Sequence, residues 1–425
     1  MNQTVPPLPP ARRNPIAAFF IGLWDVMNFT RRLILNVLFF GLLFFILVAL
    51  VVAAGMGAGA SKSLQDRTTL VIAPEGRLVE QFSADPVSRA FAKAMGDTSA
   101  EEIQLRDLIR AIDAAREDKK IERVVLELDK LQPSGFASLR EVAASLQQLR
   151  ASGKQLVAYS ESMGQSQYLL AAQADEVYLD PMGAVLLEGL GRYRQYFRTG
   201  LQDKLGVDVH LFKVGEYKSA AEPYVLDAAS PQAKEADLYW MNDVWQRYLG
   251  DIAKARRLDP AQLAAGIDTL PEGVAAAGGD LAKFALQQKL VTALKTREEF
   301  EDLMVERGVA DGDAEGGFRS INLGAYLGQV DARRSPVDSR PQVAVVVASG
   351  EISGGDLPAG RIGGESTSAL LREARDDDDV KAVVLRVDSP GGEVFASEQI
   401  RREVVALQAA GKPVVVSMGD LAASG

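Results

Sequence analysis

Short runs of apolar, often β-branched residues alternate along the chain with longer stretches of helical periodicity. The clearest example lies near the end, where residues 383–387, all apolar except Arg386, have strand length and lead into a glycine-rich turn. Residues 395–410 then carry apolar side chains at helical spacing, closed by Gly411, and residues 414–416 form another apolar run. Strand, helix and strand in this order predict parallel strands in a sheet that helices cover on both faces. We therefore predict an α/β fold.

The same order of elements occurs twice. Three pairs of segments match in sequence: 68–79 with 343–353, 117–129 with 376–388, and 149–160 with 407–417. Their offsets of 274, 259 and 258 positions are nearly constant, which indicates an internal duplication. By comparison with the first repeat, about 190 residues that would complete the second are missing from this sequence. We expect a chain cut short within its second repeat, inactive as printed and poorly packed from about residue 342.

An uncharged apolar run from residue 33 to residue 56 predicts a membrane-spanning helix. Its 24 residues would extend roughly 36 Å at about 1.5 Å per residue, enough for about 30 Å of hydrocarbon. A cleaved signal peptide is the alternative, but this run is longer than the apolar part of such peptides. Arginines precede the run, so the positive-inside rule places residues 1–32 in the cytoplasm and the chain after residue 56 across the membrane.

The composition excludes several kinds of function. The net charge is −10, and the first sixty residues carry +3, which leaves −13 for the remainder. An acidic body of this kind argues against a nucleic-acid partner. The chain has no cysteine, which excludes disulfides and thiol chemistry. We predict no cofactor and no bound metal.

Ser424 lies where the last apolar run ends, in the sequence MGDLAASG (418–425). Serine is a common N-cap of a helix, and taken alone that structural role is the more frequent one. The functional alternative is a nucleophile on a strand-to-helix turn, with its hydroxyl near the positive end of the helix. Ala422, Ala423 and Gly425 beside it have almost no side chain, which would let a substrate backbone approach.

Gly391 and Gly392 follow one predicted strand and precede a helix. Their backbone N–H groups could form an oxyanion hole there, although an ordinary turn is the alternative. In the first repeat the position of the second glycine holds Pro133, which has no N–H to donate. The serine of the first repeat, Ser166, is followed by Gln167 where the second repeat has glycine. These differences predict that the second repeat carries the specialised site.

A nucleophilic serine needs a base, and His210 is the only histidine in the chain. It lies in VDVHLFKVG (207–215), whose alternation predicts a strand, where a lone histidine is more often structural. Ser-Lys chemistry remains open, and it needs a neutral lysine, a state that burial favours. Lys218, in VGEYKSAAEPY (214–224), is a candidate of this type, although a surface lysine is the more frequent interpretation.

These motifs together resemble a known family. DSPGG (388–392), GKPVVVSMGDLAASG (411–425) and VGEYKSAAEPY are similar to the signal peptide peptidase A family, in its long two-repeat form. That resemblance covers essentially all of the chain after residue 57. It implies a Clp-protease/crotonase-like tandem repeat of ββα units, with residues 57–335 as the first repeat and 336–425 as an incomplete second repeat.

The resemblance also implies roles for single residues. It implies that Ser424 is the nucleophile, that Lys218 from the first repeat is the general base, and that the oxyanion hole lies at Gly391 and Gly392. The implied activity is that of a serine endopeptidase that degrades cleaved signal peptides or other membrane-associated peptides through an acyl-enzyme. A homotetramer in the bacterial inner membrane, with a periplasmic body, is implied as well.

Two other functions stay open from the residues alone. One is a crotonase-like acyl-CoA enzyme, which shares the glycine oxyanion hole of this fold. An anchored, acidic, extracytoplasmic body is a poor setting for a CoA ligand. The other is a non-catalytic membrane scaffold, and reaction of Ser424 with a serine-directed probe would separate it from a peptidase.

Overall fold

The computed structural model describes residues 15–57, 64–97, 101–333 and 340–424. The chain divides into two compact units, Met1–Lys62 and Ser63–Gly425. The division lies near the predicted boundary between anchor and body at residues 56 and 57. The predicted boundary between the repeats, at residues 335 and 336, falls outside the described residues and stays a prediction.

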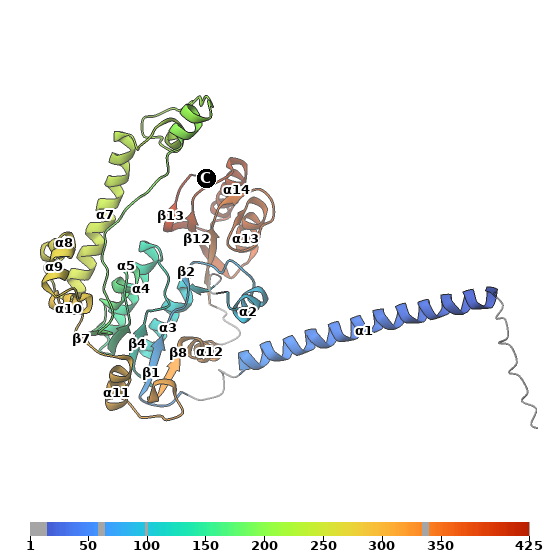
Figure 1. Ribbon diagram of the computed structural model, residues 1–425, viewed down its shortest axis with the longest axis horizontal. Coiled ribbons are helices and arrows are strands. Elements are labelled where there is room, and N and C mark those ends of the chain that lie inside the picture. Colours follow the sequence, from blue (N-terminus) through green and yellow to red (C-terminus); the bar gives the residue numbers. More distant parts are fainter. Residues whose placement is uncertain (1–14, 58–63, 98–100, 334–339, 425) are drawn as a thin grey trace, which may run out of the picture. The chain divides into compact units, whose positions relative to one another are not determined.

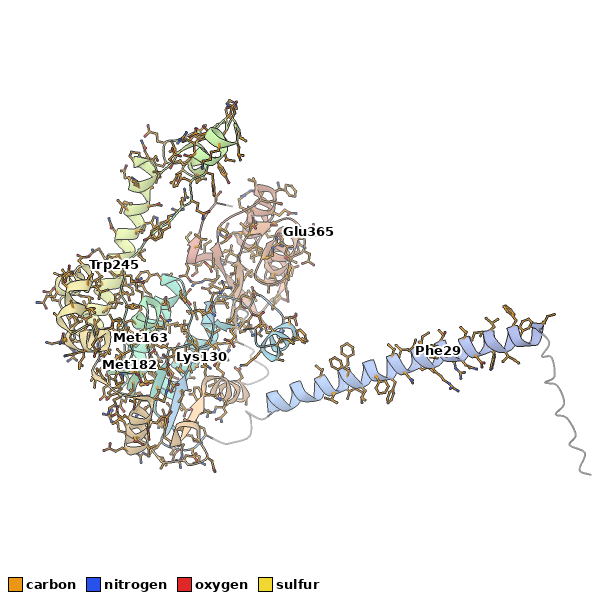
Figure 2. All side chains as sticks on the ribbon, in the orientation of Figure 1. Phe29, Lys130, Met163, Met182, Trp245 and Glu365 are labelled. Carbon is orange, nitrogen blue, oxygen red and sulfur yellow. The ribbon has the colours of Figure 1, made fainter. Side chains whose placement is uncertain are left out.

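One long helix, α1 (Pro15–Gly57), makes up the described part of the first unit. Residues Phe19–Val48 are long and apolar enough to cross a membrane, by length and composition only, and none of the side chains in the most apolar part is buried. Phe29 shows how such side chains project from the helix surface (Figure 2). The helix begins well before residue 33 and continues through Arg31 and Arg32, so the predicted span covers only its later part. Residues 1–14 of the predicted tail lie outside the described residues.

The larger sheet of the body contains six strands in the order β7-β6-β5-β4-β1-β8. Every pairing within it is parallel. The strands are β1 (Thr68–Ile72), β4 (Ile121–Glu127), β5 (Gln155–Ser160), β6 (Glu176–Leu179), β7 (Ala293–Leu294) and β8 (Ser320–Asn322). The prediction of an α/β fold with parallel strands is therefore confirmed.

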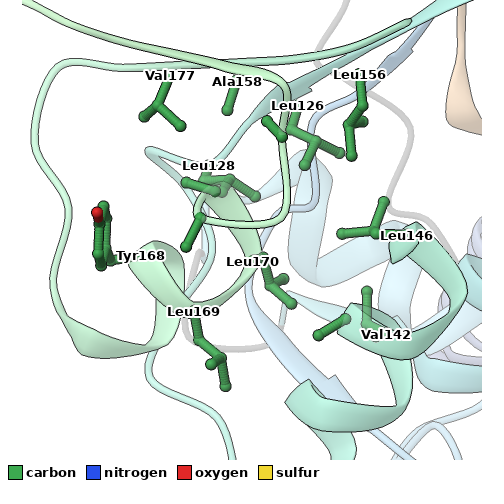
Figure 3. Close-up of a cluster of buried hydrophobic side chains, with 14 of the residues drawn as sticks. Leu126, Leu128, Val142, Leu146, Leu156, Ala158, Tyr168, Leu169, Leu170 and Val177 are labelled. Carbon is green, nitrogen blue, oxygen red and sulfur yellow. The ribbon is translucent and has the colours of Figure 1, made fainter. Parts of the chain in front are cut away.

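Helices cover both faces of this sheet, because successive strand residues point to opposite sides. On one face Leu70 and Leu126 belong to a core shared with α3 (Leu105–Glu117), α4 (Phe136–Ala151), α5 (Gln165–Ala171) and α12 (Leu323–Ala332). Figure 3 shows part of this cluster. On the other face Val125 and Tyr159 pack with Phe300 of α11 (Arg297–Arg307), whose ring stacks on that of Tyr159.

The second sheet repeats the centre of the first. Its order is β13-β12-β9, formed by β9 (Gln342–Ser349), β12 (Val380–Ser389) and β13 (Val414–Ala422), and both pairings are parallel. This order matches β5-β4-β1, as the duplication predicts. Two helices, α13 (Gly364–Asp376) and α14 (Val394–Ala409), accompany the sheet. The predicted helix over residues 395–410 is thereby confirmed to within one residue.

The packing of the second sheet differs between its two faces. Val383, Leu371 and Leu407 are fully buried in a cluster with neighbours from α13 and α14. Val345 and Val415, on the opposite face, are 56% and 59% exposed. Their counterparts in the first repeat are covered by α11. The expectation of poor packing from residue 342 therefore describes one face of this sheet and is wrong for the other.

The long helix α7 (Pro231–Arg256) carries the segment of residues 190–230 at its outer end (Figure 1). Its later part is held by the core, where Tyr248 is buried and stacks on Trp245. The outer segment contains only the short helices η2 (Thr199–Lys204) and α6 (Glu222–Val225). His210 is exposed and lies in no strand, so the strand predicted over residues 207–215 is wrong. Alternation alone does not form a strand where no neighbouring strand pairs with it.

Shorter elements make up the remaining connections. They are β2 (Arg77–Val79), α2 (Pro86–Ala94), β3 (Glu102–Gln104), α8 (Pro260–Asp268), α9 (Leu270–Ala276), α10 (Leu281–Gln287), η3 (Glu315–Gly317), β10 (Ile352–Ser353) and β11 (Ile362–Gly363). The two small strand pairs, β2 with β3 and β10 with β11, follow β1 and β9 in the chain. They are a further correspondence between the repeats.

Candidate active site

Ser424 lies two residues after the end of β13 and is exposed. Its backbone is held against the turn that follows β12. The Ala423 N–H donates to the carbonyl oxygen of Ser389 at 3.0 Å, and the carbonyl oxygen of Ser424 accepts from the Gly392 N–H at 3.0 Å. Because β12 and β13 are parallel neighbours, their carboxyl ends meet at one edge of the sheet, which is where parallel α/β sheets bind ligands.

The two predicted oxyanion glycines lie directly against this serine. Gly391 has a φ of 98°, a conformation that residues with a side chain rarely adopt. A Cβ atom on Gly391 would be 1.3 Å from the carbonyl oxygen of Ser424, and one on Gly392 would be 2.0 Å from the carbonyl oxygen of Ile352. Only glycine at these positions allows the backbones to approach so closely.

The N–H groups of the two glycines already have partners within the protein. The Gly391 N–H donates to Ser389 Oγ at 3.1 Å, while the Gly392 N–H donates to the carbonyl oxygen of Ser424. A substrate oxyanion would have to replace at least one of these acceptors. The structure therefore brings the predicted glycines to the serine but directs their donors elsewhere.

Lys218 lies in the outer segment carried by α7 and is exposed. Its backbone N–H makes a long 3.5 Å contact with the carbonyl oxygen of Gly215. Between Lys218 and Ser424, both of which the structure describes, there is no hydrogen bond. The predicted dyad is therefore not assembled in this conformation, and its assignment stays a prediction.

The matching serine of the first repeat, Ser166, lies in a turn that hydrogen bonds hold closed. Ser166 stands in the first turn of α5, and its Oγ accepts from the Ser134 N–H at 3.3 Å. Gln167 accepts from the Gly164 N–H and donates to the carbonyl oxygen of Leu131 at 2.6 Å. The side chain that replaces glycine after the serine thus fills the turn, which supports the prediction that the first repeat lost this site.

Asp388 is a residue of the site that sequence reasoning missed. It lies near the end of β12, and its Oδ1 accepts from the Leu421 N–H at 2.9 Å, three residues before Ser424. Burial raises the pKa of this carboxyl group, and the Leu421 hydrogen bond offsets only part of that effect. In the first repeat Asp129 Oδ1 likewise accepts from a backbone N–H, that of Glu161, at 2.7 Å. Both repeats have aspartate at the end of the matched strand, Asp129 in VVLELD and Asp388 in VVLRVD, and this shared residue could have indicated its role.

A second missed group joins the repeats beneath the site. Arg386 of β12 is almost buried and contacts the carboxylates of Glu80 at 2.5 Å and Glu141 at 2.6 Å. It also donates to Ser417 Oγ of β13 at 2.9 Å. Burial raises the pKa of Glu80 despite the hydrogen bond from Arg386. Because Glu80 and Glu141 belong to the first repeat, this cluster fixes the sheet of the second repeat to it.

Asp420 of β13 makes another contact between the repeats. Its carboxylate accepts from the backbone N–H of Ser138 at 3.0 Å and from Ser138 Oγ at 2.6 Å. Ser138 lies in the first turn of α4. The segment that leads to the candidate nucleophile is thereby tied to a helix of the first repeat.

The described residues show no group of three or more His, Asp or Glu side chains suited to a metal ion. A cavity of about 500 Å³ does lie between α13 and α14, lined by Glu365, Arg372 and Glu403 among others. Ser424 does not line it.

Comparison with known proteins shows what this chain is similar to. Residues 148–307 match the model of peptidase family S49. It is 38% identical to Protease 4 of Salmonella typhi over 413 residues, which are 96% of this chain and 65% of that protein. Protease 4 of Haemophilus influenzae is 33% identical over 405 residues, 95% of this chain and 65% of that protein. The chain thus spans 65% of the length of these two relatives.

A plant relative carries the name that the sequence motifs suggested. Serine protease SPPA, chloroplastic, of Arabidopsis thaliana is 27% identical over 315 residues, 72% of this chain and 44% of that protein. The S49 match and these relatives support the resemblance that the motifs predict.

Proposed function

We propose that this chain belongs to a membrane-anchored serine endopeptidase in which Ser424 is the nucleophile and Lys218 the general base. The observation that carries the proposal is the seating of Ser424 on Gly391 and Gly392, at the edge where β12 and β13 end together. The S49 match and the names of the relatives support a peptidase rather than an acyl-CoA enzyme or a scaffold.

The proposed chemistry follows from the groups at this edge. Ser424 Oγ attacks the peptide carbonyl carbon while Lys218 Nζ accepts its proton, and the carbonyl oxygen becomes an oxyanion. N–H groups of the glycine turn stabilise that charge. The C–N bond then breaks, the lysine returns the proton to the leaving amine, and water hydrolyses the resulting ester of Ser424.

Two movements are required before this chemistry. The carbonyl group of Ser424 has to rotate away so that the Gly392 N–H can face a substrate oxyanion. The outer segment that carries Lys218 has to bring its amine within hydrogen-bonding distance of the Ser424 hydroxyl. Such distances often shorten only when substrate is bound.

We assign the substrates to the peptide class and, more narrowly, to cleaved signal peptides or other membrane-associated peptides. The apolar helix α1 would hold the site at a bilayer, where such peptides remain. We retain residues 1–32 as the cytoplasmic tail, 33–56 as the anchor, 57–335 as the lysine-bearing repeat and 336–425 as the serine-bearing repeat. The body is then periplasmic in a bacterial inner membrane.

A homotetramer is the proposed assembly. The outer segment and the start of α7 expose large apolar side chains, with Tyr193 97%, Phe212 95% and Tyr239 84% exposed. A concentration of exposed large apolar side chains on one segment is typical of interaction sites. Contacts of this surface with neighbouring copies would also fix the segment that carries Lys218.

Labelling with a fluorophosphonate tests the proposal. The full-length protein that contains this sequence is treated in membranes, digested, and searched by mass spectrometry for the modified residue. We expect one modified serine, Ser424, and loss of labelling in Ser424→Ala. Ser166→Ala is the matched control from the first repeat and should label normally. Labelling that is absent, or that persists in Ser424→Ala, would refute the assignment.

A further inference from the structure

The helix α4 of the first repeat receives its N-terminal cap from the second repeat. Its own N-cap residue, Gly135, has no side chain to cap with. The carboxylate of Asp420 accepts instead from the N–H of Ser138, the third helical residue, and from its hydroxyl. An N-cap side chain normally bonds this same N–H, and a negative charge is favourable at this end of a helix.

Any side chain at position 135 would force the carboxylate of Asp420 to move. A Cβ atom on Gly135 would lie 1.9 Å from Cγ of Asp420 and 2.1 Å from one of its carboxylate oxygens. The N-cap residue of α14, Glu393, is the counterpart of Gly135 in the second repeat and carries a long side chain. The small N-terminus of α4 is therefore shaped to receive β13.

Hydrogen bonds hold most of the backbone between Asp420 and Ser424 in place. Leu421 donates its N–H to Asp388, Ala423 donates its N–H to Ser389, and Ser424 accepts from Gly392. These bonds fix the segment to the end of β12, and Asp420 fixes it to the first repeat. Movement of Asp420 along the axis of α4 would therefore displace the serine as well.

We propose that Asp420 is a positioning residue that sets the place of Ser424 relative to the first repeat by capping α4. This inference rests on the proposed role of Ser424 as nucleophile. The base is proposed to come from one repeat and the serine from the other. The contact of Asp420 with α4 would hold these two repeats in a fixed relation to each other. A displacement of about 1 Å in a catalytic group can lower a rate about 100-fold.

The test measures fluorophosphonate labelling of Ser424, kcat and KM for a peptide ester, and the urea midpoint, all in the full-length protein. Asp420→Ala should lower the labelling rate and kcat about 100-fold with little change in KM. Asp420→Asn keeps an oxygen for the Ser138 N–H and should restore most of the rate. Asp259→Ala is the matched control, because it removes the ordinary cap of α8, which bonds the Ala261 N–H at 2.9 Å, and should leave labelling unchanged.

A double variant tests the contact itself. Gly135→Ala alone should slow labelling, because its methyl group meets the carboxylate of Asp420. In Gly135→Ala with Asp420→Ala the methyl group has room, so the double variant should be no slower than Asp420→Ala. Ser138→Ala removes only the 2.6 Å bond and should slow labelling less, which keeps the test valid where Asp420→Ala does not fold.

The inference is overturned if folded Asp420→Ala labels at the wild-type rate, if the effects of Gly135→Ala and Asp420→Ala multiply, or if Ser138→Ala changes nothing. Absence of Ser424 labelling in the wild type is a different outcome. It would refute the proposed function, whatever the Asp420 variants did.

Discussion

Gly391 leaves room for the carbonyl group of Ser424, because a Cβ atom on Gly391 would lie 1.3 Å from that oxygen. Gly391→Ala should therefore displace the serine and lower the rate of Ser424 labelling about 100-fold or more. Gly411→Ala is the matched control, since Gly411 also has a positive φ, 80°, but nothing lies within 4 Å of its Cβ position. Each variant should lose about 1–2 kcal/mol of unfolding free energy from the backbone conformation alone. Equal labelling rates in the two variants would contradict this account.

Arg386 should make a large contribution to stability because it pairs with Glu80 and Glu141 in a nearly buried place. Arg386→Ala leaves the Glu80 carboxylate without its cation, and we expect a loss of about 3 kcal/mol in unfolding free energy, measured by urea denaturation. Arg401→Ala breaks an exposed pair with Glu398 and should change the urea midpoint little. If the two variants have the same midpoint, the Arg386 cluster does not hold the repeats together.

Asp388 should give the folded protein a distinct dependence on pH. Because burial raises its pKa, the folded state holds this proton at a pH where the unfolded state, near a pKa of about 3.9, has lost it. Its contribution to stability is thus full below about pH 4 and declines as the pH rises through the folded pKa. Asp388→Asn should remove that decline, so its stability relative to wild type should improve as the pH rises from about 4.

A carboxylate with the opposite shift is the control for this experiment. The hydrogen bond from Arg247 lowers the pKa of Asp243, so its contribution is present above the unfolded pKa and lost as the pH falls. The stability of Asp243→Asn relative to wild type should therefore improve as the pH falls. Differences of the same sign for the two variants would show that burial does not dominate at Asp388.

The orientation of the anchor has its own test. Arg31, Arg32 and the earlier arginines should hold the N-terminus in the cytoplasm. A reporter enzyme that folds only outside the cytoplasm should therefore be active when it is fused after residue 62, and a reporter that works only in the cytoplasm should be inactive there. Protease added to spheroplasts should digest the body. The proposed topology would be contradicted if the body were protected from protease, or if only the reporter that works in the cytoplasm were active.

Much of the fold could be predicted because the repeats share one pattern of strands. The matched segments around Val124 and Val383 gave two central strands, and the structure pairs both with parallel neighbours in the same order. The strand predicted around His210 failed because alternation indicates a strand only where backbone partners exist. The start of α1 was missed because Arg31 and Arg32 end an apolar run without ending a helix.

The residues of the candidate site were easier to predict from the sequence than the contacts that these residues make. Gly391, Gly392 and Ser424 stand next to strand ends, so local pattern was enough to propose them. Asp420 and Ser138 are 282 positions apart, and no periodicity within either segment indicates that they touch. The bond between the Gly392 N–H and Ser424 is likewise a product of the folded turn.

The most direct test of the central claim is peptide cleavage by the full-length protein and by three variants. Ser424→Ala and Lys218→Ala should each abolish cleavage while the urea midpoint stays at the wild-type value, because one removes the nucleophile and the other its base. His210→Ala should cleave at the wild-type rate, since His210 is exposed and bonds to nothing in the proposed site. Loss of cleavage in His210→Ala together with retained cleavage in Lys218→Ala would contradict the proposed mechanism.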